Sequence, residues 1–237
     1  MFKPNCNLTQ TVAAKKAILF DLFHTLTSIE TTPGNNRPFT HQILRVSKEA
    51  WEEQLHKHSR ERLTGEKKDP LVIVAERAHA IDPSIPEDMI REATENRIAR
   101  FATALTRIPD EAVRVLRTLK SRGKQIGLVS NSDAMEVKAW EQSPIVGLFD
   151  SAVFSCFVGC VKPEPAIYHI AMGELEVVPT ETLFVGDGGS KELEGARSLG
   201  ITTVMFTGII KQFWPERIPG QRPYADFIIE TLFDLVM

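Results

Sequence analysis

Several polar side chains in this sequence follow short apolar runs, and their types suit chemistry on an anionic group. They are Asp21 with Thr25, Ser130 with Asn131, Lys162, and Asp187 with Glu192. A carboxylate can act as a nucleophile or a metal ligand, and a lysine supplies a fixed positive charge for a phosphoryl oxygen. Two aspartates held close together repel each other unless a cation lies between them, and such oxygen ligands favour magnesium.

Each of these residues also has a plainer explanation when it is taken alone. Asp21, for example, could cap the turn after its apolar run, because aspartate is common at such positions. The combination of two acids, a hydroxyl–amide pair and a lysine behind separate buried segments favours a catalytic site instead.

A set of strands must bring these side chains together. Ala17–Phe20 is a short apolar run, typical of a strand buried on both faces, and it stops at Asp21. Further strands are predicted at Gln125–Val129, Ser151–Phe157, Thr182–Val185, Ile201–Phe206 and Phe227–Ile229. Helices are predicted around them at 109–123, 133–142, 165–175 and 190–199.

The alternation of strands and helices predicts an α/β fold with a parallel sheet and right-handed crossovers. We expect Ala17–Phe20, Gln125–Val129 and Thr182–Val185 to be its central strands. Because the carboxyl ends of parallel strands share one edge of the sheet, the polar residues should converge there.

Residues 28–105 carry no strand signal and are predicted to be a helical insertion after the first strand. A loop rich in Pro, Gly and Asn covers Thr31–Thr40, and apolar residues recur at helical spacing around 43–55, 71–80 and 87–105. We therefore predict an α/β core formed by residues 1–27 and 106–237, with a helical cap formed by residues 28–105. The first ten residues are predicted to be a loose tail.

The composition argues against several classes of function. The 237 residues carry a net charge of -3, which gives no electrostatic basis for binding nucleic acid. No apolar run approaches the roughly 20 residues that a membrane span needs. Cys6, Cys156 and Cys160 form an odd set, which favours free thiols in a reducing, cytoplasmic compartment. We expect a small-molecule substrate, and a monomer or a homodimer.

Four motifs together resemble those of the haloacid dehalogenase superfamily of hydrolases. They are DLFHTL beginning at Asp21, GLVSNS with Ser130, VKPEP with Lys162, and FVGDGGSKE with Asp187. The resemblance covers about 17–27 and the chain from about 109 onward, and the helical insertion lies where this family places its C1 cap. It implies a Rossmann-like core and a magnesium-dependent hydrolase, in the first place a phosphatase acting on a small phosphorylated metabolite.

The resemblance also implies roles for the residues around the transferred group. Asp21 would attack phosphorus and form an aspartyl-phosphate intermediate. Ser130 would donate to a phosphoryl oxygen, Asn131 would fix the loop or the substrate, and Lys162 would neutralise negative charge. Thr25 would stabilise the loop after the first strand beside the substrate.

A magnesium site is implied by the same motifs. Its ligands would be the carboxylates of Asp21 and Asp187 and the backbone carbonyl of Phe23. Glu192 would act through water.

Phe23 departs from the pattern of the superfamily's phosphatases, which usually carry a second aspartate at this position as general acid and base. Dehalogenases of the superfamily carry an aromatic residue there, because halide leaves without a proton, and phosphonate-cleaving members also lack the acid. The alternatives are therefore a 2-haloacid dehalogenase, or a phosphonoacetaldehyde-type hydrolase that would use a cap lysine such as Lys48 or Lys57. A non-catalytic binding protein with the same fold is a further alternative.

His24 could replace the missing acid, because its imidazole titrates in the right range. Adjacent side chains of an extended segment point in opposite directions, so Phe23 and His24 would face the leaving group together only if the loop bends sharply. The alternative is a hydrogen-bonded histidine under the cap.

The predicted cap contains further histidines and arginines with two possible roles. The histidines are predicted to lie on the surface, with one able to reach the site when the cap closes: His41, His56, His58 and His79. The arginines would either recognise substrate charge or form a solvated basic helix face: Arg91, Arg97, Arg100 and Arg107.

Overall fold

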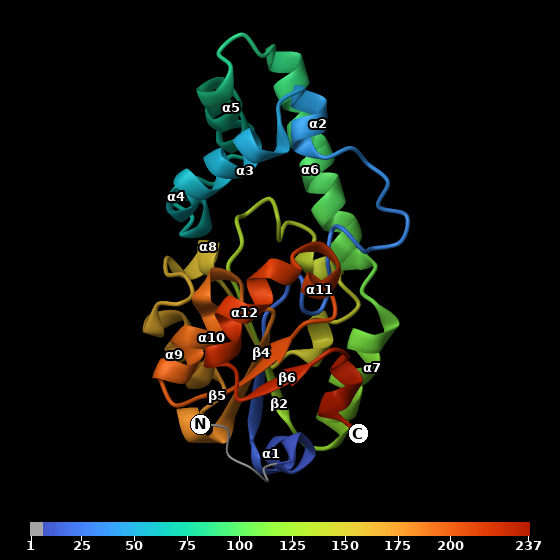
Figure 1. The fold of residues 1–237 in the computed structure, drawn as a ribbon, viewed down its shortest axis with the longest axis vertical. Helices are drawn as coiled ribbons and strands as arrows, with labels where there is room; N and C mark the ends of the chain where they lie inside the picture. Colours follow the sequence, from blue (N-terminus) through green and yellow to red (C-terminus); the bar gives the residue numbers. More distant parts are fainter. Residues whose placement is uncertain (1–6) are drawn as a thin grey trace.

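A computed structural model describes residues 7–237, which contain a six-stranded parallel sheet with helices on both faces (Figure 1). The strands are β1 (Ala17–Phe20), β2 (Gln125–Ser130), β3 (Ser151–Phe154), β4 (Thr182–Gly186), β5 (Thr202–Phe206) and β6 (Phe227–Ile229). They lie in the order β3-β2-β1-β4-β5-β6, and all neighbouring strands are parallel. The predicted α/β fold is confirmed, and β1, β2 and β4 are interior strands as expected.

The helices fall into one group between β1 and β2 and another outside that stretch of the chain. The first group is α2 (Thr40–Leu44), α3 (Lys48–Lys57), α4 (Ser59–Leu63), α5 (Pro70–Ile81), α6 (Glu87–Thr106) and α7 (Asp110–Ser121). The others are α1 (Leu8–Ala14), α8 (Ser155–Val158), α9 (Pro165–Glu174), α10 (Glu192–Ser198), α11 (Ile210–Phe213) and α12 (Ile218–Gln221). Short 3₁₀ turns lie at η1 (Trp140–Gln142), η2 (Val146–Leu148), η3 (Pro179–Glu181), η4 (Gly189–Lys191), η5 (Pro215–Arg217), η6 (Arg222–Tyr224) and η7 (Leu232–Leu235).

The strand β1 is buried on both faces, as its unbroken apolar run predicts. Ile18 and Phe20 pack into the core layer that contains α1, α7 and η7. Ala17 and Leu19 pack into the opposite layer, with α9 and α10. Both faces of the sheet are therefore covered up to the point where β1 ends and Asp21 begins.

Helices α2 to α6 form a separate group at the carboxyl edge of the sheet, and Figure 1 shows them above the core. They share a hydrophobic cluster of their own, in which Trp51, Val74 and Ile90 are buried. Met135 from the core side also joins this cluster. The chain thus places a helical cap directly after its first strand, as predicted.

The prediction of a helix over residues 133–142 is wrong. Asp133 and Glu136 do exchange the two reciprocal side-chain to backbone hydrogen bonds that usually start a helix, at 3.1 and 3.0 Å. The chain nevertheless continues as turns up to η1. Both carboxylates are also bonded to arginines of the cap, so tertiary ion pairs compete with helix propagation here.

Three smaller predictions also differ from the structure. The expected tail of ten residues includes the start of α1, and the Asn7 side chain caps this helix by accepting a hydrogen bond from the backbone N–H of Thr9. Residues 1–6, and with them Cys6, lie outside the described part. The helix expected around 43–55 is two helices, because Arg45 adopts a left-handed φ of 56° and Ser47 caps α3. The third strand ends at Phe154, where α8 follows.

Cys156 and Cys160 are free and buried. Burial raises the pKa of the Cys156 thiol to about 12, so this thiol is not a nucleophile at neutral pH. Over residues 7–237, no helix combines the length and the apolar character required to cross a lipid bilayer.

Candidate active site

Three carboxylates meet at the carboxyl edge of the sheet. Asp21 follows β1, Asp187 follows β4, and Glu192 is the first residue of α10. One oxygen from each lies within 4.8 Å of the others, and all three residues are buried. The structure therefore brings together acids from distant parts of the sequence, as the parallel sheet predicts.

Lys162 is the positive group within this cluster. Its Nζ lies 2.5 Å from Asp21 Oδ1 and 2.5 Å from Glu192 Oε2. Burial disfavours the charged form of this amine, but the attraction of the two carboxylates prevails and raises the pKa of Lys162 above its ordinary value. The amine is therefore fully charged at neutral pH and points at the predicted nucleophile.

Three acids against one lysine leave an excess of negative charge. Burial and repulsion by Asp21 raise the pKa of Asp187 and, more strongly, that of Glu192. A divalent cation between the carboxylates would remove this repulsion, and a buried all-oxygen donor set suits magnesium. The residues present therefore fit the ion that the sequence predicts.

Glu192 makes direct contacts that the sequence did not predict, and its water-mediated role toward the metal stays a prediction. Besides binding Lys162, it accepts a hydrogen bond from the backbone N–H of Gly188 through Oε1, at 3.0 Å. Gly188 adopts a φ of 91°, and a Cβ there would approach Gln221 Cγ to 2.7 Å, so glycine is required at this position. Glu192 thus fixes both the lysine and the loop that carries Asp187.

Ser130 and Asn131 occupy the end of β2 with different functions. The Ser130 hydroxyl is buried and has no hydrogen-bond partner among the described residues, so it is free to donate to a bound group. The Asn131 side chain instead bonds both backbone groups of Lys162, at 2.7 Å and 3.0 Å. Asn131 therefore fixes the loop that carries the lysine, which is one of the two roles expected for it.

The loop after β1 bends sharply at His24, whose φ is 64°. The Thr25 hydroxyl in this loop donates to Asp21 Oδ2 at 3.1 Å. The bend places Phe23 and His24 in the lining of the same pocket, so the opposite orientation of an extended segment does not apply. The Phe23 ring meets Phe101 of α6 edge to face, with centroids 5.0 Å apart.

His24 forms an ion pair with a residue that sequence reasoning missed. Its Nε2 lies 3.1 Å from Glu30 Oε2, and its Nδ1 lies 3.9 Å from Asp187 Oδ2. Burial opposes protonation of the imidazole, but the bond to Glu30 and the nearby acids raise the pKa of His24. Nothing in the local pattern marks Glu30, because only the bend brings it to His24.

The acids and Lys162 open into a cavity of about 320 Å³ between the core and the cap. From the cap it is lined by His56, Ser59, Arg62, Leu63 and Phe101, and from the core by Asp21, Ser130, Lys162, Asp187 and Arg217, among others. Of the predicted cap histidines, His56 reaches this cavity. Lys48 and Lys57 do not line it.

The ion pairs between cap and core were also missed by sequence reasoning. Arg62 of α4 lies 2.9 Å from Asp133 Oδ2, and Arg97 of α6 lies 2.5 Å from Glu136 Oε1. Arg97 and Arg100 are buried, so the solvated basic face considered for these cap arginines does not exist at these two positions. Arg100 instead donates to the backbone carbonyls of Ile29 and Arg37 in the linker after β1.

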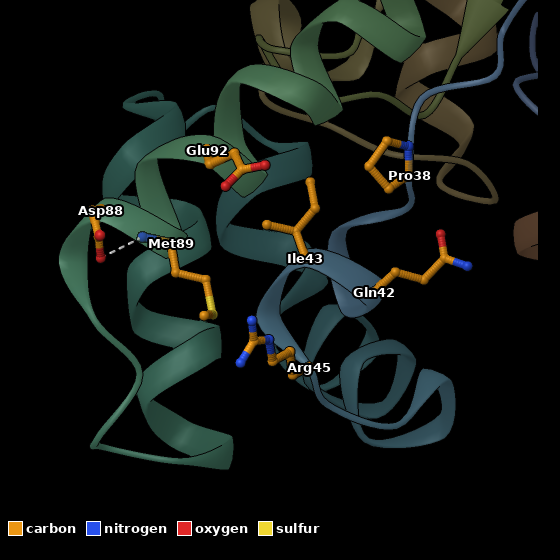
Figure 2. Close-up of a pocket in the computed structure, with 7 residues that line it drawn as sticks. All are labelled: Pro38, Gln42, Ile43, Arg45, Asp88, Met89 and Glu92. Atoms are coloured by element: carbon orange, nitrogen blue, oxygen red, sulfur yellow. Dashed lines mark hydrogen bonds between the residues drawn. The ribbon is translucent and has the colours of Figure 1, made fainter.

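A second cavity, of about 430 Å³, lies within the cap (Figure 2). Its lining comes from the segment around α2 and from the start of α6, and includes Ile43, Arg45, Asp88, Met89 and Glu92. No member of the acid cluster lines it, so the predicted chemistry belongs to the first cavity.

The chain is similar in sequence to known hydrolases. The profile of the haloacid dehalogenase-like hydrolases matches residues 15–200. A glyceraldehyde 3-phosphate phosphatase of Pyrococcus furiosus is 31% identical over 137 residues, which are 56% of this chain and 55% of that protein. A bifunctional epoxide hydrolase 2 of Rattus norvegicus is 30% identical over 53% of this chain and 23% of its own length. The matched segment thus spans about half of the phosphatase and less of the epoxide hydrolase.

Solved structures of similar fold include dehalogenases and a phosphatase. The L-2-haloacid dehalogenase of Xanthobacter autotrophicus superposes with a TM-score of 0.63 at 19% identity, covering 93% of this chain and 96% of that one. A HAD phosphatase from Thermococcus onnurineus superposes with a TM-score of 0.56 at 22% identity, covering 93% and 95%. At these identities the structural similarity establishes the fold and does not identify the reaction.

Proposed function

The chain belongs to the haloacid dehalogenase-like hydrolases, and on this basis we propose that it is a magnesium-dependent phosphatase acting on a small phosphorylated metabolite. The observation that carries the proposal is the buried cluster of Asp21, Asp187 and Glu192 within 4.8 Å. Displacement of a halide does not need a metal, whereas transfer of a phosphoryl group benefits from one. The phosphatase named among the relatives supports the same reaction class.

In the proposed reaction, Asp21 attacks phosphorus while the bond from phosphorus to the ester oxygen breaks, and the departing alkoxide takes a proton from water. A water molecule then hydrolyses the aspartyl-phosphate to inorganic phosphate and restores Asp21. Lys162, 2.5 Å from Asp21 Oδ1, orients the nucleophile and compensates the charge on the phosphoryl oxygens. The unpartnered Ser130 hydroxyl donates to one of those oxygens. Thr25 holds the other oxygen of the nucleophile at 3.1 Å, and Asn131 positions the backbone of Lys162.

Asp21, Asp187 and the backbone carbonyl of Phe23 would hold the metal, with Glu192 beside them. When bound, magnesium supplies positive charge that offsets the repulsion between the carboxylates and the phosphoryl oxygens. The cap over this pocket would limit the access of bulk water during the attack. We also propose that the cap, residues 28–105, and the core, residues 1–27 and 106–237, are two domains.

The test is phosphate release from a panel of phosphorylated metabolites, with and without magnesium. We expect release that depends on magnesium and falls by at least about 10³-fold in Asp21→Asn, because the nucleophile is lost. Asp110→Asn is the matched control, since Asp110 is an exposed aspartate at the start of α7. Release that Asp21→Asn leaves unchanged would contradict the proposal.

Phe23 favours a second candidate, a 2-haloacid dehalogenase. A phenyl ring next to the nucleophile cannot protonate an alkoxide, but a departing halide needs no proton. Halide release from a 2-haloacid without added metal, abolished by Asp21→Asn, would assign this reaction. The carbon–phosphorus hydrolase receives no comparable support, because neither Lys48 nor Lys57 lines the cavity.

A further inference from the structure

The cavity contains cations whose charges are already matched by carboxylates. Lys162 contacts Asp21 and Glu192. Arg62 contacts Asp133 and also Glu136, at 2.9 and 3.5 Å. Apart from the phosphoryl group proposed to lie at Lys162, neither cation can bind a second anionic group of a substrate without giving up a buried partner.

Arg217 is different from these two cations. It ends η5, in the segment that follows β5, and it lines the same cavity on the core side. Among residues 7–237, no hydrogen bond or ion pair reaches its guanidinium group. The group instead lies over the ring of Trp214, with Cζ 4.6 Å from the ring centroid.

The position of Arg217 is tied to the catalytic loop through Trp214. The Trp214 ring meets the His24 ring edge to face, with centroids 4.9 Å apart. Arg217 is an exposed residue, and the aromatic stack holds its guanidinium without a hydrogen bond or ion pair from the described residues. A planar guanidinium with free donors matches a carboxylate, which it can bind with two parallel hydrogen bonds.

We propose that Arg217 binds a carboxylate of the substrate, so that the preferred substrates are small phosphorylated carboxylic acids. The inference rests on the proposed phosphatase activity and adds the class of substrate to it. The cavity volume of about 320 Å³ is at the lower end of the range for ligand pockets, which suits a short acid better than a bulky bisphosphate. The phosphoryl group lies at Asp21 and Lys162, and the carboxylate lies at Arg217.

The kinetic test compares two esters that differ in the relevant group alone, 3-phosphoglycerate and glycerol 3-phosphate. The wild-type protein with magnesium should have a kcat/KM at least about 10-fold higher for the carboxylate, as expected for a charge-assisted hydrogen bond. Arg217→Gln should remove this preference mainly through KM. Arg114→Gln is the matched control, because Arg114 is an exposed arginine over an aromatic ring, Phe233, outside the cavity.

A binding test separates this inference from the proposed reaction. Asp21→Asn removes the nucleophile, so calorimetry on this variant reports affinity for the intact esters without turnover. We expect Asp21→Asn to bind 3-phosphoglycerate about 10-fold more tightly than glycerol 3-phosphate. Adding Arg217→Gln to this variant should abolish the preference, whereas adding Arg114→Gln should leave it unchanged. This pattern without turnover in the wild type would support Arg217 while refuting the phosphatase. Equal affinities, no binding of either ester, or a preference that survives Arg217→Gln would overturn the inference.

Discussion

Phe23 is the residue at which this chain differs from a phosphatase site. It lines the cavity beside Asp21 and packs against Phe101 of the cap, so it contributes an apolar contact where an acid would transfer a proton. Poor leaving groups should therefore react slowly, since a general acid is worth about 10²- to 10⁴-fold in rate.

Phe23→Asp should raise the turnover of alkyl phosphates by up to about 10²-fold and change that of an activated aryl phosphate little. The ratio of alkyl to aryl turnover at saturating magnesium measures this effect. Phe23→Asn is the matched control, because it removes the same contact with Phe101 without supplying an acid. A wild-type protein that already hydrolyses both classes equally fast would show that another group, such as His24, supplies the proton.

Asp187 and Glu192 should differ in their effects on the metal. Asp187→Asn should weaken magnesium binding more than Glu192→Gln does, because both Glu192 oxygens already serve Lys162 and Gly188. We expect at least about a 10-fold difference between the two magnesium affinities in titration calorimetry. Equal losses of magnesium affinity would show that Glu192 is a direct ligand that contributes as much to binding as Asp187 does.

At the scale of elements, the cap is connected to the core by ion pairs as well as by its two linkers. Helix α4 contributes two arginines to this interface. Arg62 pairs with the buried Asp133, whereas Arg60 pairs with Glu164 in a more exposed setting. The turn over 133–142 supplies the buried carboxylates, which accounts for its departure from helix.

Glu136→Gln should lower the free energy of unfolding by about 3 kcal/mol, because it leaves the buried Arg97 without its charge partner. Glu164→Gln, which breaks the exposed pair across the same interface, should cost less than about 1 kcal/mol. Chemical unfolding of the two variants beside the wild type measures the difference. Similar costs for both would mean that the buried pair contributes no more than a surface one.

At the scale of the whole molecule, the acid cluster links stability to pH and to magnesium. Burial and repulsion by Asp21 raise the pKa values of Asp187 and Glu192. Groups with a raised pKa in the folded state stabilise it when they are protonated. Their contribution is complete below the unfolded carboxyl pKa of about 4 and is lost as the pH rises through the folded-state values.

Magnesium should therefore raise the melting temperature more at pH 7.5 than at pH 5, where protons compete more strongly with the metal for Asp187 and Glu192. Ligand at about 100 times its dissociation constant stabilises a protein by about 2.7 kcal/mol. Thermal unfolding with and without magnesium at the two pH values measures this, and Asp187→Asn should show a smaller rise at pH 7.5. An equal rise in melting temperature at both pH values would show that the magnesium effect does not depend on these carboxylates.

The sequence by itself determined the sheet and the identity of the clustered residues. The apolar run of Ala17–Phe20 and the polar residues behind it are local features, and parallel strands necessarily bring such ends to one edge. The sequence alone therefore predicts that Asp21, Lys162 and Asp187 lie close together, as they do in the structure. Their catalytic and metal-binding roles stay predictions.

Only the tertiary structure decided the surroundings of this cluster. Each of three features there depends on a partner elsewhere in the sequence. The left-handed bend at His24 depends on Glu30, 6 residues away, and the burial of Arg97 depends on Glu136, 39 residues away. The turn after Asp133 depends on Arg62, 71 residues away. Arg217 reaches the cavity because its segment folds back over the loop of Asp187. Periodicity and propensity report on neighbours within a few residues, so contacts between distant charged groups lie beyond them.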